Sequence, residues 1–294
     1  MKSKSDSIIF NLFSYIIVGI VAVSCLLPFY VLIVNSFSSE NSIVLHGYRF
    51  FPVEFSLAAY SEIFKAAEYG VLNSYKITII RTVMLTIISL LLSSMAAYTL
   101  SRKDVKYRNK LAFYLFFTML FSGGLVPSYI LNVRYFHLKN TFLILLIAGL
   151  LSVPYIFILR TYITTSISDA LSEAAKIEGA NDFMIFIKII LPLMKPSLAS
   201  IGLFTAIGCW NDWFTAMLYI DDLKLMPLQY MLYRILSIVT FRNVNDLPGG
   251  LVIRMPEETL KMAMTAVVTG PIIFLYPFVQ RYFVTGITLG AVKS

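Results

Sequence analysis

The sequence predicts an all-α integral membrane protein with six transmembrane helices. Hydrophobic residues make up 58% of the 294-residue chain and charged residues only 14%, and the mean hydropathy is +0.79. Soluble domains are typically about 45–50% apolar and about 25% charged. A soluble fold of this size could not cover so much apolar surface, so we expect a lipid bilayer to be the solvent.

Six apolar segments are long enough to cross the bilayer, because about 20 helical residues span about 30 Å of hydrocarbon. We expect residues 1–294 to form a single transmembrane domain built on these segments. The spans are expected at about residues 8–34, 71–101, 111–133, 140–160, 196–220 and 262–284.

Basic residues predict the orientation. The segment Arg102–Lys110, which follows the second span, has five basic residues in nine. Because cytoplasmic loops are enriched in Lys and Arg, both termini and the loop 161–195 are expected in the cytoplasm. The loops 35–70 and 221–261 are then external, and we expect short helices and turns in both. The net charge of +8 is attributed to residues that face lipid headgroups, so no nucleic-acid partner is expected.

Signatures of catalysis are absent from the sequence. There is no phosphate-binding glycine loop, no HExxH pair and no GxSxG nucleophile turn. His46 and His137 are isolated, and Cys25 and Cys209 lie in apolar runs where cysteine acts as a small hydrophobic residue. We therefore expect no enzyme activity, no metal site and no cofactor in this chain.

The predicted cytoplasmic loop 161–195 has the pattern of two helices joined by a tight turn. Asp169 can cap the first helix and Gly179 suits its left-handed end, while Asn181 can cap the second helix and Pro192 can end it. One face of the first helix is thin enough for the groove of a partner protein to close over it; the alternative is an amphipathic linker on the membrane surface. The residues that make this face thin are Ala174, Ala175 and Gly179.

This loop resembles the signature loop of permease subunits of ATP-binding-cassette (ABC) importers. Seven residues at fixed spacing carry the resemblance, which implies that the loop docks into a cleft of the ATP-hydrolysing subunit and couples ATP use to transport. The matching residues are Glu173, Ala174, Ala175, Gly179, Ile189, Leu191 and Pro192.

The rest of the chain is similar to the second permease of maltose-type carbohydrate importers, and to the subgroup associated with complex or uronate-containing oligosaccharides. Ser168 departs from this pattern, because the family often has proline there, and this loosens the cap expected for the first loop helix. The matching segments are Asn73-Ser74, Arg81–Val83, Ala96–Arg102, Phe121–Pro127 and Trp210–Phe214.

The resemblance implies the fold and partners of a type I ABC importer permease. It implies a second homologous permease, two ABC ATPase subunits that bind ATP and Mg, an extracellular solute-binding protein and an oligosaccharide substrate. It also implies a multi-pass position in the bacterial cell membrane. Two alternatives stay open: a permease-like scaffold that acts as a sensor for a signalling partner, and an importer of a non-sugar solute.

Asp212 is the only acidic residue within the expected spans. A charge at the centre of a transmembrane helix costs about 2.5–3.5 kcal/mol on insertion scales, so it must face protein or water. With Trp210, Asn211 and Trp213 it forms a candidate sugar-binding group on the substrate pathway. Alternatively, Asp212 pairs with Arg81 or lies at the membrane interface.

Arg81 and Tyr98 are the other candidates for the substrate pathway. The planar guanidinium of Arg81 suits a carboxylate, which is either a protein acid or a uronate of an acidic oligosaccharide. Tyr98 has packing as its alternative role. In the loop 221–261, Asn245 and Gly249 are the candidates for docking the solute-binding protein, and the alternative is a lid that packs only on the permease.

Overall fold

The computed structural model describes residues 4–65, 71–244, 257–271 and 273. These residues are mostly helical, and within them the extended pairing is limited to one isolated bridge between Ser38 and Phe55. The chain forms two compact units. The first unit comprises Met1–Val71 and Leu232–Pro271, and the second comprises Leu72–Met231 and Ile272–Ser294.

The first unit combines the N-terminal helix with parts of both long loops. Large apolar side chains between Phe10 and Ile33 are mostly exposed along its first helix, which suits a helix surrounded by lipid or by other membrane helices. Its helices are α1 (Lys4–Ser36), α2 (Glu40–His46), α3 (Ala58–Lys65), the part of α14 (Leu228–Val244) from Leu232 onward, and residues 258–271. With 17 residues, α14 is longer than the short helices expected in this loop.

Glu40 fixes the start of the helix formed by residues 258–271. Its Oε1 accepts hydrogen bonds from the backbone N–H groups of Glu257 (3.1 Å) and Glu258 (2.9 Å). Its Oε2 accepts the N–H (2.9 Å) and the hydroxyl (2.7 Å) of Thr259. The first N–H groups of a helix have no partner within the helix, so the Glu40 carboxylate supplies the missing acceptors.

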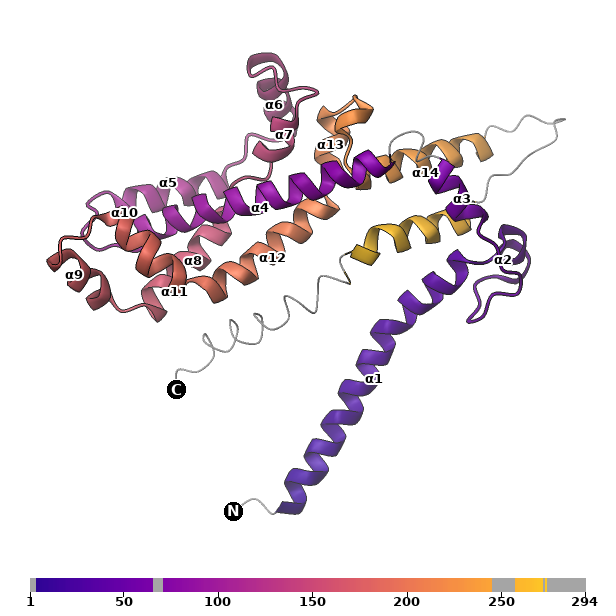
Figure 1. The fold of residues 1–294 in the computed structure, drawn as a ribbon, viewed down its shortest axis with the longest axis horizontal. Helices are drawn as coiled ribbons and strands as arrows, with labels where there is room; N and C mark the ends of the chain where they lie inside the picture. Colours follow the sequence, from indigo (N-terminus) through magenta and orange to yellow (C-terminus); the bar gives the residue numbers. More distant parts are fainter. Residues whose placement is uncertain (1–3, 66–70, 245–256, 272, 274–294) are drawn as a thin grey trace. The chain divides into compact units, whose positions relative to one another are not determined.

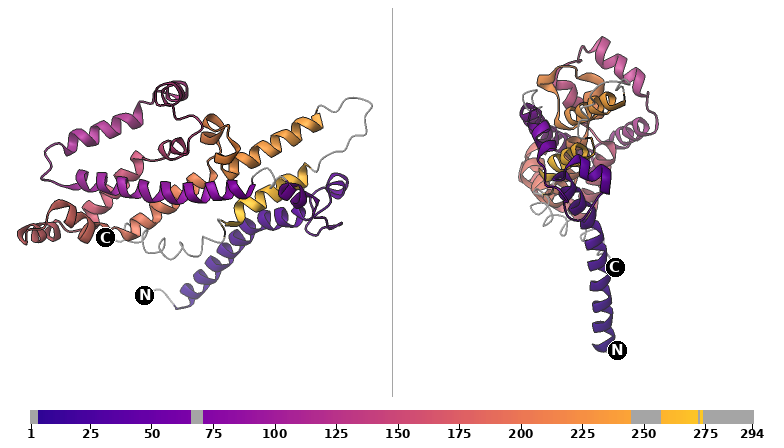
Figure 2. Two further views of the ribbon diagram at one scale, coloured as in Figure 1. Left: turned by 45° about the horizontal axis from the view of Figure 1, so that its top comes forward. Right: turned by 90° about the vertical axis from the view of Figure 1, so that its right-hand side faces the viewer.

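The second unit is organised along α4 (Val71–Ser101), a 31-residue helix. The segment α9–α11 lies at the C-terminal end of α4, whereas α7 and α13 lie toward its N-terminal half (Figures 1 and 2). Turns η2 and η3 are π-helical and η4 is a 3₁₀ turn. The remaining elements are α5 (Arg108–Leu120), α6 (Leu125–Ile130), η2 (Leu131–Tyr135), α7 (Phe142–Ile147), α8 (Val153–Ser166), α9 (Asp169–Ile177), α10 (Asp182–Ile185), η3 (Phe186–Ile190), α11 (Leu191–Leu193), α12 (Lys195–Asn211), α13 (Phe214–Tyr219) and η4 (Leu223–Leu225).

Three of the expected spans are interrupted helices. The span expected at 111–133 breaks between α5 and α6, and Gly124, which precedes α6, adopts a φ of +88° that other residues rarely tolerate. The span expected at 140–160 breaks between α7 and α8. A new helix, α8, begins at Val153 with Pro154 in its first turn, where proline is favoured. The span expected at 196–220 leaves the helix at Asp212, whose carboxylate accepts the N–H of Thr215 and so starts α13.

The described residues contain two single helices that are long and apolar enough to cross a membrane, Phe10–Ser36 and Val71–Ser101. Two further spans are counted if each sharply bent pair is one span: Arg108–Leu120 with Leu125–Tyr135, bent by 108°, and Asp182–Leu193 with Lys195–Asn211, bent by 79°. About half of the sixth expected span, 262–284, lies outside the described residues. The six-helix count therefore stays a prediction.

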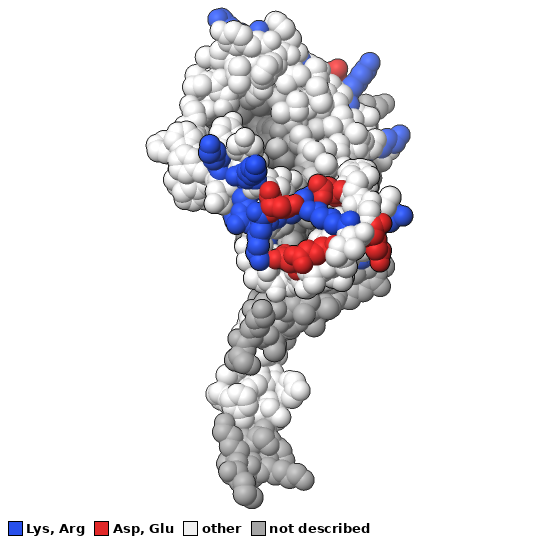
Figure 3. All heavy atoms as spheres, turned by 90° about the vertical axis from the view of Figure 1, so that its left-hand side faces the viewer, with Lys and Arg blue, Asp and Glu red and all other residues white. Residues whose placement is uncertain are grey.

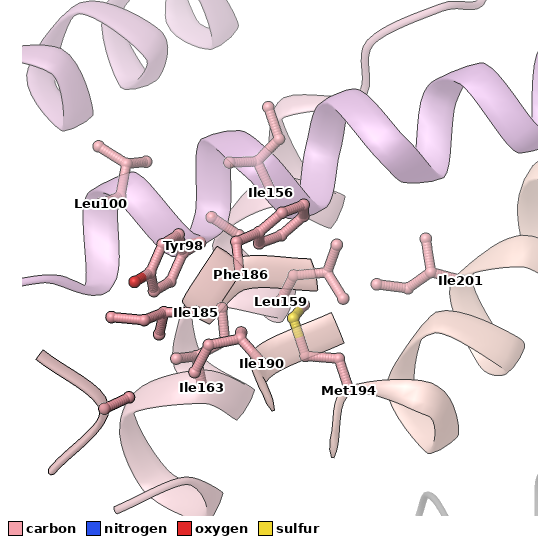
Figure 4. Close-up of a cluster of buried hydrophobic side chains, with 12 residues drawn as sticks. Tyr98, Leu100, Ile156, Leu159, Ile163, Ile185, Phe186, Ile190, Met194 and Ile201 are labelled. Carbon is pink, nitrogen blue, oxygen red and sulfur yellow. The ribbon is translucent and has the colours of Figure 1, made fainter. Parts of the chain in front are cut away.

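A large buried cluster joins the predicted cytoplasmic loop to the long helices. In Figure 4 side chains from α4, α8, α10, η3 and α12 converge, and the Tyr98 and Phe186 rings stack with their centroids 5.6 Å apart. Because the loop contributes to this core, part of it is held by apolar packing. The cluster consists of Ala97, Tyr98, Leu100, Ile156, Leu159, Ile163, Ala175, Ile185, Phe186, Ile190, Met194 and Ile201.

Candidate functional site

The turn between α9 and α10 has a fully bonded left-handed cap. The N–H of Gly179 donates to the carbonyl of Lys176 (3.0 Å), and the N–H of Ala180 donates to that of Ala175 (2.9 Å). This pair of bonds defines a Schellman motif, and Gly179 has the positive φ, +83°, that the motif requires. A Cβ at Gly179 would meet no atom within 4 Å, so backbone strain rather than crowding favours glycine here. The expected role of Gly179 as the end of the first loop helix is confirmed.

The N-terminal caps agree with the sequence at one helix and differ at the other. Asn181 caps α10 as expected, with its Oδ1 accepting the N–H of Met184 at 2.8 Å. The prediction that Asp169 caps α9 is wrong: Ser168 is the cap, and its hydroxyl accepts the N–H of Ala170 at 3.4 Å. Asp169 is already helical, and its carboxylate instead pairs with Lys103 at 2.7 Å.

Pro192 does not end the second loop helix, as the sequence had suggested. The chain stays helical through Leu193, and the break follows at the 79° bend before α12. A π turn precedes the proline, with the N–H of Leu191 bonded to the carbonyl of Phe186 five residues back. This wider turn changes the register of the backbone bonds just where proline lacks an N–H, so the helix continues past it.

The seven signature residues divide into an exposed set and a packing set. Glu173, Ala174, Gly179 and Pro192 are exposed at the end of the second unit. By contrast, Ala175 is buried in the large cluster, and Ile189 and Leu191 pack against it. The loop is therefore anchored by one set of signature residues and presents the other set outward.

The exposed face of this loop is also apolar. Ile177 is 88% exposed at the end of α9. Exposed apolar side chains that form a contiguous patch mark interaction surfaces. The other large apolar side chains exposed on α9, α10 and η3 are Leu171, Phe183, Met184 and Ile187.

Besides the Lys103–Asp169 pair, four charged residues tie the loop to the end of α4, and we call them the Arg102 cluster: Arg102, Asp104, Lys176 and Asp182. The Arg102 guanidinium pairs with Asp104 and, at 2.5 Å, with Asp182. Lys176 Nζ lies 2.6 Å from Asp104 Oδ2 and 4.0 Å from Asp182 Oδ1. Acidic and basic side chains intermix around a hollow at this end in Figure 3.

The Arg102 cluster lies beside a cavity of about 240 Å³ that α4, α8 and α9 line. Hydrogen bonds from Arg102 and Lys176 hold the pKa of the Asp104 carboxyl well below its usual range. The same contact with Asp104 raises the pKa of Arg102. Asp104 and Arg102 therefore stay oppositely charged and in contact at neutral pH.

A second charged group lies in the interior of the same unit. Arg81 is only 2% exposed, and its Nη2 contacts Asp212 Oδ2 at 2.5 Å. Its Nη1 donates to the backbone carbonyl of Asp212 (3.3 Å) and its Nε to the carbonyl of Leu145 (3.0 Å). Arg81 thus joins α4 to α7 and to the break between α12 and α13, with the protein acid as its partner.

The structure brings together most of the residues predicted for the substrate pathway. Around the helix break at Asp212, Trp210 is buried, whereas Asn211 and Trp213 are exposed. The side chain of Asn211 accepts a hydrogen bond from Gln229 at 3.1 Å. Tyr98 is not part of this group, because it lies 17 residues beyond Arg81 on α4, about 25 Å along the helix. It packs in the large cluster, which is the alternative role given above. A role in substrate contact stays a prediction for the others.

Two features, one in each unit, were not predicted from the sequence. Two predicted residues lie outside the described part of the chain. In the sequence, Arg102 only contributes to the basic segment that predicts the orientation, because its partner Asp182 is 80 residues away in the chain. Nothing in the sequence singled out Glu40. The receptor-docking candidates Asn245 and Gly249 lie outside the described residues.

A helical, apolar chain with an anchored, outward-facing helix–turn–helix loop has the features of a membrane component that engages a partner. Residues 106–289 match the family described as "Binding-protein-dependent transport system inner membrane component". The chain belongs to this family. It is a transport permease component rather than an enzyme, and the resemblance found in the sequence is confirmed.

Relatives cover nearly the whole chain. The chain is 37% identical to the polygalacturonan/rhamnogalacturonan transport system permease protein YtcP of Bacillus subtilis (strain 168), over 97% of this chain and 99% of that protein. It is 34% identical to protein LplC of the same organism, over 100% of this chain and 98% of that protein. A solved structure described as a bacterial ABC transporter involved in the import of the acidic polysaccharide alginate matches with a TM-score of 0.79 and 32% identity, over 96% of this chain and 99% of that chain.

Proposed function

We propose that this chain is one of two permease subunits of an ATP-driven oligosaccharide importer in the bacterial cell membrane. The names of the relatives support the sugar substrate, and the apolar helices support the membrane position. In this proposal the chain crosses the membrane six times with both termini in the cytoplasm. A second homologous permease, two ABC ATPases and an extracellular solute-binding protein complete the importer.

The loop between α8 and α12 carries the coupling proposal. Its cap geometry fixes a short helix, α9, and the exposed signature residues and the apolar Ile177 face outward beside it. A small, capped helix that exposes both apolar and charged side chains suits insertion into a cleft of an ATPase subunit. ATP-driven closure of the ATPases would then move α9 and change the access of the pathway.

The proposed substrate is a uronate-containing oligosaccharide. Two relatives support this class, one named for polygalacturonan and rhamnogalacturonan and one described as importing the acidic polysaccharide alginate. The residues around the helix break at Asp212 are the proposed contacts of this subunit along the pathway: Trp210, Asn211 and Trp213.

The coupling proposal is tested by reconstituting the full importer in proteoliposomes with its binding protein. ATP hydrolysis and oligosaccharide uptake are measured for the wild type and for Glu173→Ala. Because Glu173 is exposed on α9, we expect the complex to assemble while uptake falls relative to the ATP hydrolysed.

The matched control is Glu62→Ala, which removes the same charge from α3, where Glu62 pairs with Lys65 at 2.9 Å. Its uptake and hydrolysis should match the wild type. If Glu173→Ala retained full substrate-stimulated hydrolysis together with normal uptake, the coupling role of α9 would be rejected.

A further inference from the structure

We propose that Arg102 is a positioning residue that, through the Arg102 cluster, sets the orientation of α9 and links its movement to the end of α4. This inference rests on the proposed function, because it concerns how the coupling helix is held. Arg102 follows α4 directly, and its guanidinium pairs with two other members of the cluster, through which it acts.

Apolar packing holds the two loop helices unequally. Of the nine residues of α9, only Ala175 is buried. The second helix is better anchored, since Ile185 of α10 and Phe186 and Ile190 of η3 are all buried. Packing therefore fixes α10 and η3 on α4 and α8, but it leaves α9 with little apolar attachment of its own.

The turn between the two helices does not compensate for this difference. The exposed Gly179 is the only left-handed residue in the turn, and a Cβ there would meet no neighbouring atom. The Schellman bonds fix the local path of the backbone. They do not attach α9 to any element outside the loop.

Charged contacts supply the missing attachment. Lys176 near the end of α9 pairs with Asp104 at 2.6 Å, and Asp182 at the start of α10 pairs with Arg102 at 2.5 Å. Arg102 and Asp104 also pair with each other. Both helices that flank Gly179 are thus bound to the same short segment after α4, which fixes the angle between them.

An arginine suits this role better than a lysine would, because of the geometry of its side chain. Its guanidinium reaches two carboxylates at once, and its carbon Cζ lies 5.6 Å from the centre of the Tyr98 ring. Tyr98 in turn stacks on Phe186. A planar fork with five donors can hold both acids and the ring together, whereas an ammonium acts as a single point of charge.

The test uses the reconstituted importer with all its subunits. We expect Arg102→Gln to leave assembly and basal ATP hydrolysis in place and to lower the uptake per ATP hydrolysed by about fivefold or more. Arg102→Lys should recover only part of the loss. Lys106→Gln is the matched control, since Lys106 is an exposed basic residue of the same loop and its removal should change nothing.

A double-mutant cycle separates positioning from general destabilisation. Because Arg102 and Asp182 act as one unit, Arg102→Gln combined with Asp182→Asn should lower the uptake per ATP little further than Arg102→Gln alone. Additive losses in the double variant would overturn the inference while leaving the proposed function intact. So would an Arg102→Gln variant whose uptake per ATP matches that of Lys106→Gln. If the wild-type importer itself showed no uptake linked to ATP, the proposed function would fail instead.

Discussion

Arg81 illustrates how a single buried cation can hold three helical segments. Its donors are used by the Asp212 carboxylate, by the Asp212 backbone carbonyl and by the carbonyl of Leu145. The carbonyl of Leu145 belongs to α7, a six-residue helix. The ion pair therefore stabilises the helix breaks themselves, and a uronate on the substrate would need other donors.

We predict that Arg81→Gln destabilises the importer by about 3–5 kcal/mol, because it leaves the Asp212 carboxylate without its partner in the interior. Arg81→Gln combined with Asp212→Asn should cost less than Arg81→Gln alone, since no uncompensated charge remains. The measurement is thermal unfolding of the purified complex. Lys76→Gln, an exposed cation on the same helix, is the control and should leave the unfolding midpoint unchanged.

Equal midpoints for Arg81→Gln and Lys76→Gln would contradict this structural role. So would a double variant whose loss is the sum of the two single losses.

The sequence indicated Asp212 as unusual, because a lone charge in an apolar run demands a partner. It also offered Arg81 among the alternatives, and the pair is formed. It could not indicate the Leu145 carbonyl, because any backbone carbonyl can accept a hydrogen bond and its availability depends on where α7 ends. Side-chain chemistry is visible in a sequence, whereas a free backbone acceptor is a property of the fold.

At the scale of elements, two of the four local signals in the loop 161–195 were predicted correctly, and the helix breaks were not predicted. Gly179 ends α9 and Asn181 begins α10, as expected, because a cap depends on residues within one turn. The breaks at Gly124 and Asp212 fall inside long apolar segments, and the single charge of Asp212 changes the mean hydropathy too little to indicate a break. A glycine at positive φ precedes one of the helices that follow these breaks and a capping carboxylate precedes the other, and neither changes the average apolar character of the segment.

The Glu40 cap supports a further prediction at this scale. Glu40→Ala removes the acceptor of three backbone N–H groups at the start of residues 258–271, which we expect to cost about 1–2 kcal/mol. Hydrogen exchange of the intact importer should show faster exchange at the amides of Glu258 and Thr259. The loss should be smaller for Glu40→Gln, which keeps one acceptor oxygen.

Glu62→Ala on α3 serves as the control and should leave exchange at Glu258 and Thr259 unchanged. Unchanged exchange in Glu40→Ala would show that the cap does not determine the start of this helix.

At the scale of the whole molecule, composition and one loop motif were enough to predict the class of protein. Apolar excess predicted the membrane, and seven spaced residues predicted the permease family, which the comparisons confirm. The Arg102 cluster was beyond reach, because Asp104 and Lys176 are 72 positions apart. Charged residues are common in any cytoplasmic loop, and only the fold determines which of them contact one another.

The proposed acidic substrate is tested at the same scale, with the complete importer. We predict faster uptake of an oligogalacturonate than of a neutral oligosaccharide of equal length in the wild type. Because the guanidinium of Arg81 is occupied by Asp212 and Leu145, Arg81→Gln should change both uptake rates by the same factor. Rates are measured per assembled complex, so that lower stability does not distort the ratio. Faster uptake of the neutral sugar by the wild type would refute the acidic substrate, whereas a selective loss of uronate uptake in Arg81→Gln would assign this arginine to the substrate after all.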